Sequence, residues 1–155
     1  MKLRTHVCFR SNYPDEETWM ENGDDLLRGP GFKTASILVE ILNRAGFKVS
    51  SPCERDYYGW EFHVSGGLQF VITFGLEENK EGEESLLLQS YASFLRRLFS
   101  PKKLSQLHYD VLAKIDEFLK QDGRFRDIRW FTFEEYDSKE RKDGHPDPFI
   151  SQDHL

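Results

Sequence analysis

Two residues of one predicted strand carry side chains that can transfer protons. Glu61 and His63 are two positions apart in the segment GWEFHV, residues 59–64. Side chains at positions i and i+2 of a strand share a face, so this carboxylate and imidazole could work as a general base and a general acid. A solvated strand face that holds two compatible charges explains the same pair, and we favour that interpretation.

Other motifs with established chemistry do not occur in the sequence. The five histidines show no HExxH spacing, the two cysteines form no CxxC pair, and there is no G-x-S-x-G elbow. The turn Gly29-Pro30-Gly31 precedes a predicted helix but lacks the lysine and hydroxyl of a P-loop. We therefore expect no metal, no cofactor and no catalytic residue. The alternative is a small enzyme of unknown class that uses Glu61 and His63.

Two segments combine acidic and aromatic residues, as protein interfaces do. Six carboxylates lie between Ser11 and Asp25, with two large aromatic rings and without lysine or arginine. Aromatic rings anchor interfaces, and carboxylates speed the encounter with a cationic partner. The predicted partner-binding residues are Tyr13, Asp15, Glu16, Glu17, Trp19, Asp56, Tyr57 and Tyr58. The alternatives are a solvated acidic loop and tyrosines that cap the core with their hydroxyls in water.

The overall charge limits the choice of partner. A net charge of −6 and a pI of about 5.4 disfavour nucleic acid, whose binding depends on a basic face. The basic stretch RRLFSPKK, residues 96–103, is interpreted as a solvated junction between elements. Apolar runs are too short to cross a bilayer, so we expect a cytoplasmic protein that binds no membrane. A basic protein partner fits this charge.

Hydrophobic periodicity predicts one α+β domain over residues 1–136 and a loose polar tail over 137–155. About five strands are expected in an antiparallel-rich sheet, in the order β-α-β-β-β-α-β, with both helices on one face. The expected elements are strand 2–10, helix 32–45, hairpin arms 60–64 and 68–74, strand 85–91, a helix from Pro101 to the residues before Gly123, and strand 126–133. The first strand alternates and is expected to have one covered face. Ser100 is expected to cap the second helix with its hydroxyl.

The hairpin has a register that follows from its apolar residues. Cross-strand partners must share a face. A loop of three residues, Ser65-Gly66-Gly67, pairs Val64 with Leu68 and Phe62 with Phe70, whereas a two-residue turn pairs apolar with polar side chains. We therefore predict the longer loop, with Gly67 in the left-handed conformation. Trp60 is predicted to point inward and to anchor its strand.

Four segments carry a resemblance to known proteins: AGFKVSSP, DYYGWEFHV, LRRLF and DIRW. Together they resemble a group of small, uncharacterised bacterial cytoplasmic proteins, over most of residues 30–130. In size, acidity and lack of a catalytic motif the chain is also similar to immunity proteins, which neutralise polymorphic or contact-delivered toxins. The resemblance implies an inhibitor that covers the active or substrate-binding surface of a basic toxin domain. A regulatory or adaptor domain is a further alternative, and the sequence leaves monomer and homodimer open.

Overall fold

The computed structural model describes residues 2–13, 29–55, 59–77, 82–138 and 143–151. Six strands and four helices follow one another in these ranges. In chain order they are β1 (His6–Ser11), α1 (Phe32–Arg44), β2 (Cys53–Arg55), β3 (Gly59–Val64), β4 (Leu68–Phe74), β5 (Glu84–Ala92), α2 (Phe94–Phe99), α3 (Pro101–Gln121), β6 (Phe125–Phe131) and α4 (Phe133–Asp137).

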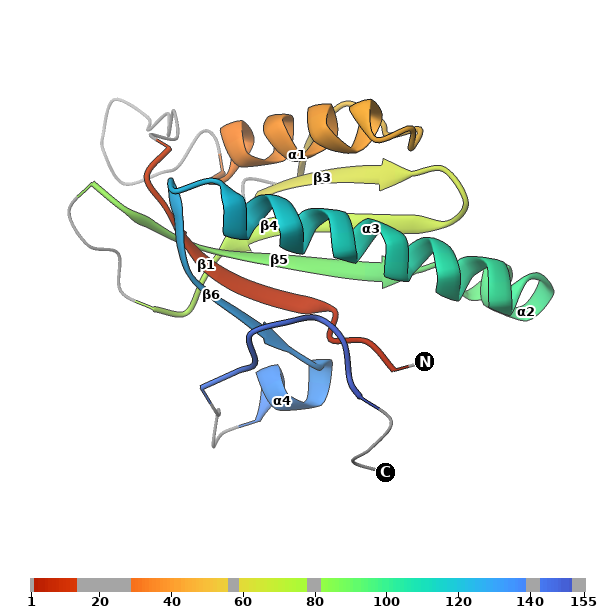
Figure 1. The fold of residues 1–155 in the computed structure, drawn as a ribbon. Coiled ribbons are helices and arrows are strands. Elements are labelled where there is room, and N and C mark those ends of the chain that lie inside the picture. Colours follow the sequence, from red (N-terminus) through yellow and green to blue (C-terminus); the bar gives the residue numbers. More distant parts are fainter. Residues whose placement is uncertain (1, 14–28, 56–58, 78–81, 139–142, 152–155) are drawn as a thin grey trace.

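All six strands form one antiparallel sheet in the order β2-β3-β4-β5-β1-β6. Helices α1 and α3 cover one face of this sheet, and the short helix α4 lies beyond β6 on the other side (Figure 1). The predicted α+β class is confirmed, with six strands where about five were expected. The additional strand is β2, a short and fully exposed edge strand.

The hairpin of β3 and β4 has the predicted register. Val64 pairs with Leu68, Phe62 with Phe70 and Trp60 with Ile72, which leaves the loop Ser65-Gly66-Gly67. Gly67 has a φ of 108°, as that loop requires. The rings of Phe62 and Phe70 stack with centroids 5.2 Å apart, so the pairing aligns two aromatic side chains across the hairpin.

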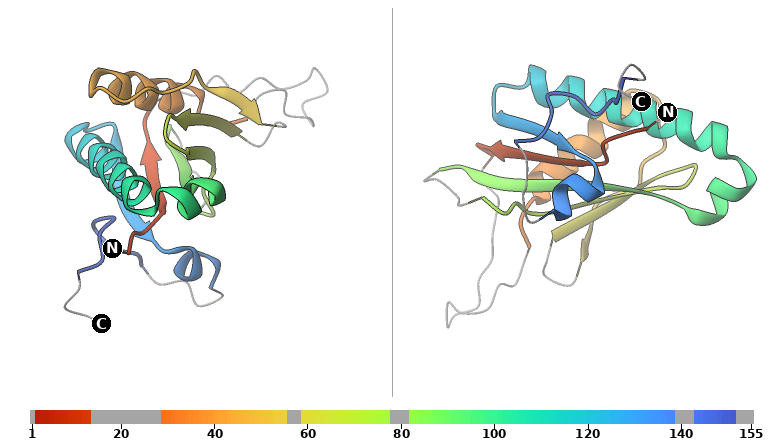
Figure 2. Two further views of the ribbon diagram at one scale, coloured as in Figure 1. Left: turned by 90° about the vertical axis from the view of Figure 1, so that its right-hand side faces the viewer. Right: turned by 90° about the horizontal axis from the view of Figure 1, so that it is seen from below.

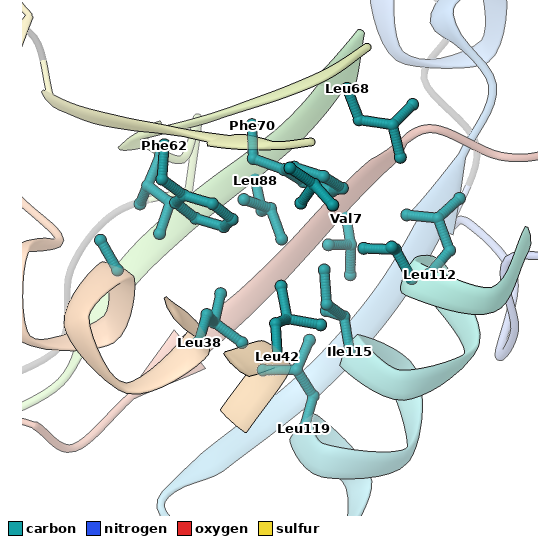
Figure 3. Packing of buried hydrophobic residues seen from close by; sticks show 14 of the residues in the cluster. Val7, Leu38, Leu42, Phe62, Leu68, Phe70, Leu88, Leu112, Ile115 and Leu119 are labelled. Atoms are coloured by element: carbon teal, nitrogen blue, oxygen red, sulfur yellow. The ribbon is translucent and has the colours of Figure 1, made fainter. Parts of the chain in front are cut away.

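The main core lies between the sheet and the two long helices. Phe62 and Phe70 face the leucines of α1 and the apolar stripe of α3, among them Leu38, Leu42 and Ile115 (Figure 3). Each of these five side chains is at most 1% exposed. Helices α1 and α3 are amphipathic, and burial of their apolar sides against the sheet holds both of them on one face.

Trp60 anchors its strand to the start of α1, as predicted. The side chain is 5% exposed, and its Nε1–H donates to the carbonyl oxygen of Gly29 at 3.0 Å. The ring of Phe32, the first residue of α1, lies 4.6 Å from the indole. One tryptophan therefore fixes the angle at which α1 meets the sheet.

The first strand is covered on both faces, so the prediction of one covered face is wrong. Val7 and Phe9 enter the main core, while His6 and Cys8 are buried on the opposite face. The His6 ring stacks on Tyr136 of α4 at 5.5 Å. Helix α4 begins with a capping box, in which Thr132 and Glu135 satisfy each other's backbone N–H groups, and it was missed in the sequence.

Residues 143–151 are attached to the domain, contrary to the expected loose tail. His145 and Trp130 exchange two backbone hydrogen bonds, of 2.8 and 2.9 Å, along the outer edge of β6. The Arg4 guanidinium donates to the carbonyl oxygens of Asp147 and Phe149 at 3.1 and 2.6 Å. The segment thereby pairs with the outer edge of β6 at Trp130, whose backbone groups would otherwise be unpaired on that side.

Helix α3 starts at Pro101, as predicted, but the expected role of Ser100 is wrong. The Ser100 hydroxyl makes no capping hydrogen bond within the described chain. Its backbone N–H instead donates to the carbonyl oxygen of Arg96 at 2.8 Å and ends α2. Ser100 thus forms the junction between the two helices, because its backbone N–H makes the last hydrogen bond of α2 and the next residue, Pro101, begins α3.

Candidate functional site

Helix α2 projects from one end of the sheet, next to the turn of the β3–β4 hairpin (Figures 1 and 2). It starts where β5 ends, and Ser93 caps it by accepting from the backbone N–H of Arg96 at 3.5 Å. The backbone N–H of Ser93 donates to the carbonyl oxygen of Gly67 at 2.7 Å. The hairpin turn therefore fixes the place at which α2 leaves the sheet.

Every residue of α2 is exposed, although most of them are apolar. The exposed fractions are 71% for Phe94, 64% for Leu95, 61% for Leu98 and 82% for Phe99. Side chains of this size have areas on the order of 150–200 Å², so together they expose roughly 400–550 Å². A contiguous apolar patch of that size on a monomer often marks an interaction surface.

Cations surround this patch. Arg96, Arg97, Lys102 and Lys103 are all exposed, and no aspartate or glutamate occurs between Ser85 and Tyr109. The rest of the chain carries the excess of negative charge, since the net charge is −6. We call residues 94–103 the α2 tip. It is a basic and apolar projection on an acidic molecule.

A cavity of about 610 Å³ lies beside the α2 tip at the end of the hairpin. His63, Gln69 and Tyr91 line it and stand in register on β3, β4 and β5. Glu61 is outside the lining, but its carboxylate lies 3.8 Å from His63 Nε2 and accepts a hydrogen bond of 2.8 Å from Gln69. The predicted proximity of Glu61 and His63 is confirmed. Arg55 of β2 adds a cation 3.8 Å from the same carboxylate.

A second cavity, of about 400 Å³, lies between the N-terminal segment, β5 and the first turns of α3. Ser90 and His108, 4% and 7% exposed, line it, and Ser90 Oγ lies 2.8 Å from His108 Nε2. Burial, with a further contribution from the Arg97 guanidinium, lowers the pKa of His108 to about 4. The imidazole is therefore neutral near pH 7, which suits a group that exchanges hydrogen bonds in a closed site.

A third group of charges, on the sheet face opposite α1 and α3, has a structural role. Arg10 is 8% exposed and lies 3.3 Å from both Glu77 and Asp127. Arg129 reaches the same Glu77 carboxylate. Because each cation of this group is paired with a carboxylate, we interpret it as a support for β1 and β6.

Most of the residues predicted to bind a partner lie outside the described ranges. They are Asp15, Glu16, Glu17, Trp19, Asp56, Tyr57 and Tyr58. Tyr13 is described and is half-buried. Its hydroxyl lies 3.2 Å from the Asp122 carboxylate, and the Arg124 guanidinium lies 4.0 Å above its ring. Tyr13 is thus held by neighbours at the end of α3.

Two features of the site were missed in the sequence. The α2 tip was interpreted as a solvated junction, although it exposes four large apolar side chains. His108 was not among the candidate residues, and its pairing with Ser90 was not foreseen. A signal did exist for His108, because it lies four residues after Leu104 and three before Val111, within the apolar stripe of α3.

No cluster of metal-ligating side chains and no membrane-spanning helix occurs among the described residues. These residues contain no group of three or more His, Cys, Asp or Glu side chains placed to hold a metal ion. None of the helices in the described ranges has both the length and the apolar character that crossing a bilayer requires. No protein-family model, no curated protein and no solved structure matches this chain.

Proposed function

We propose that this chain is a protein-binding module that docks on its partner through the α2 tip. The observation that carries the proposal is the exposure of Phe94, Leu95, Leu98 and Phe99 on a helix with no buried residue. Leaving these side chains in water is unfavourable by about 25 cal/mol for each Å² of apolar surface. A partner that covers the tip removes that cost.

The charge around the tip specifies what the partner must offer. Arg96, Arg97, Lys102 and Lys103 surround the apolar residues, so a groove with an apolar floor and a carboxylate rim is complementary. A stable complex buries about 1,200–2,000 Å² in all. The tip supplies the apolar centre of such an interface, and the neighbouring polar surface supplies the rim.

The finer proposal is an immunity-type inhibitor that covers the active or substrate-binding surface of a toxin. Its support comes from the sequence resemblance and from the acidic and aromatic segments. Those segments fit cationic surface, whereas the α2 tip fits carboxylates. A toxin that contacts both the acidic segments and the α2 tip would therefore present cations on one part of the covered surface and carboxylates on another.

Site-specific photo-crosslinking tests the docking surface. A photoreactive amino acid replaces Leu98 in one variant and Lys114, on the far half of α3, in a matched control. In cells that produce the partner, we expect a crosslinked protein at position 98 and none at position 114. Equal crosslinking at both positions, or none at either, contradicts docking through the tip.

A second experiment separates inhibition from simple binding. The captured protein is purified, and its activity is measured with the wild-type chain and with the double variant Leu98→Asp and Phe99→Asp. The immunity-type proposal expects inhibition by the wild type and its loss in the variant, because two buried carboxylates would face an apolar floor. Full partner activity in the bound complex contradicts inhibition while leaving the docking surface supported.

A specific observation also favours the alternative, a small enzyme. His63 lies 3.8 Å from Glu61 and opens on the 610 Å³ cavity, with Tyr91 across the sheet. If this pair transfers protons, His63→Gln should abolish turnover while the free energy of unfolding stays within about 0.5 kcal/mol of the wild type, because the side chain is exposed. An activity that survives this substitution excludes the pair.

A further inference from the structure

The 400 Å³ cavity is lined by cations and hydroxyl groups. Arg97 and Lys2 contribute positive charge, Ser90 and Ser105 contribute hydroxyls, and His108 forms part of the wall. No carboxylate occurs among the residues described as lining it. The charge of the cavity therefore favours an anion.

Arg97 is available to a ligand. Its guanidinium forms no ion pair or side-chain hydrogen bond within the described part of the chain, whereas Lys2 also acts on the Glu134 carboxylate. The charge of Arg97 reaches His108 strongly enough to oppose protonation of the ring. A guanidinium with no partner among the described residues thus lines the cavity and acts on the buried imidazole.

The hydroxyl of Ser90 determines which nitrogen of His108 carries the proton. Ser90 Oγ donates to the carbonyl oxygen of Thr5 at 3.3 Å and lies 2.8 Å from His108 Nε2. Because its single proton goes to Thr5, the neutral ring carries its own proton on Nε2 and donates it to Ser90 Oγ. The ring is thereby fixed in the wall of the cavity, next to Arg97, where its signals can respond to a bound anion.

From these observations we propose that the cavity between the N-terminal segment, β5 and α3 binds a small oxyanion, a phosphate or a carboxylate. The Arg97 guanidinium and the Lys2 ammonium balance the charge of the ligand, while the Ser105 hydroxyl donates a hydrogen bond. A volume of about 400 Å³ admits a small organic group beside the anion, since ligand sites of this kind measure about 300–1,000 Å³. The inference goes beyond docking through the α2 tip and does not depend on it.

Titrations followed by NMR test the site with inorganic phosphate, phenyl phosphate and acetate as probes. Saturable shifts of the His108 ring signals are expected, while the ring of exposed His63 serves as an internal reference. The range should extend to about 10 mM, which detects dissociation constants near 1 mM. Absence of saturation with all three probes, or equal shifts of both rings, overturns the proposal.

Two arginines of the same helix provide matched variants. Arg97→Gln removes a cation that lines the cavity, and Arg96→Gln removes its neighbour, which does not line it. A hydrogen bond to a charged group contributes about 1.5–3 kcal/mol, so Arg97→Gln should weaken binding at least tenfold. Arg96→Gln should change it less than about twofold, as expected for screened surface charge. Equal losses of affinity in the two variants would show that only the overall positive charge matters, and this result overturns the proposal.

Vesicles distinguish a free phosphate from a lipid headgroup. The same wild-type and Arg97→Gln proteins are sedimented with phosphatidylcholine vesicles, with and without phosphatidic acid. Binding of phenyl phosphate in solution without sedimentation supports a soluble ligand. Sedimentation that requires both phosphatidic acid and Arg97 assigns the same oxyanion chemistry to a headgroup. Sedimentation that is unchanged in Arg97→Gln, together with no binding in solution, contradicts the proposal.

Discussion

The buried imidazole of His108 should make the stability of the fold depend on pH. In the unfolded chain the ring titrates at its ordinary pKa of 6.5, whereas in the folded chain burial, aided by Arg97, lowers the pKa to about 4. As the pH falls below 6.5, the ring becomes protonated in the unfolded state but stays neutral in the folded state, so the free energy of unfolding falls. From about pH 7.5 to about pH 5, linkage gives a loss of about 2 kcal/mol from this one group.

The measurement is the free energy of unfolding in urea, across that pH range, for the wild type and His108→Gln. Glutamine does not titrate, so the loss of about 2 kcal/mol that comes from His108 should be absent from the variant's profile. Ser90→Ala serves as the control, because it removes the hydrogen bond and keeps the titrating ring. It should lower stability at every pH and leave most of the slope. The reasoning is refuted if wild type and His108→Gln lose stability in parallel. Burial also lowers the pKa of His6, and this residue contributes equally to the pH dependence of both proteins.

Three further substitutions probe separate parts of the fold. Arg4→Ala should speed amide hydrogen exchange in residues 143–151, because the guanidinium donates to two carbonyl oxygens there, and unchanged protection would contradict that attachment. Phe99→Ala should alter the free energy of unfolding by less than about 0.5 kcal/mol, because the ring is exposed and packs against no core. A larger loss of stability, measured by urea unfolding, would mean that the ring packs within the fold. Gly59→Ala should cost about 3 kcal/mol or more, because a Cβ would overlap the carbonyl oxygen of Ile72, and a stable variant would disprove that contact.

The local parts of the fold could be predicted because each has its signal in one short stretch of sequence. The hairpin register follows from apolar residues that must share a face, and the stop of α1 follows from Gly46, which adopts a φ of 96°. The position of β1 could not be predicted in the same way. It lies between β5 and β6, and no periodicity within His6–Ser11 specifies which distant strands become its neighbours. The attachment of residues 143–151 was missed for the same reason, because their polar composition conceals contacts made mainly by backbone groups.

The candidate site shows the same difference between local features, which could be predicted, and long-range contacts, which could not. Glu61 and His63 are two residues apart on one strand, so their proximity could be predicted. Ser90 and His108 lie on different elements, and only the packing of α3 against β5 brings them together. The α2 tip was misjudged for another reason. Its pattern of leucine, phenylalanine and arginine fits a helix that covers a core, and the sequence does not reveal that no core lies beneath it.

The position of β1 between β5 and β6 has a consequence for folding during synthesis. Its two neighbours, β5 and β6, begin at Glu84 and Phe125, so β1 has no neighbouring strand until residues 84–92 have been synthesised. Contacts between residues so far apart in sequence form late, because a long loop must be closed before they are made. The β3–β4 hairpin and α1 have nearer partners and can assemble meanwhile. We therefore expect β1 to enter a sheet that is already partly built, once β5 has been synthesised.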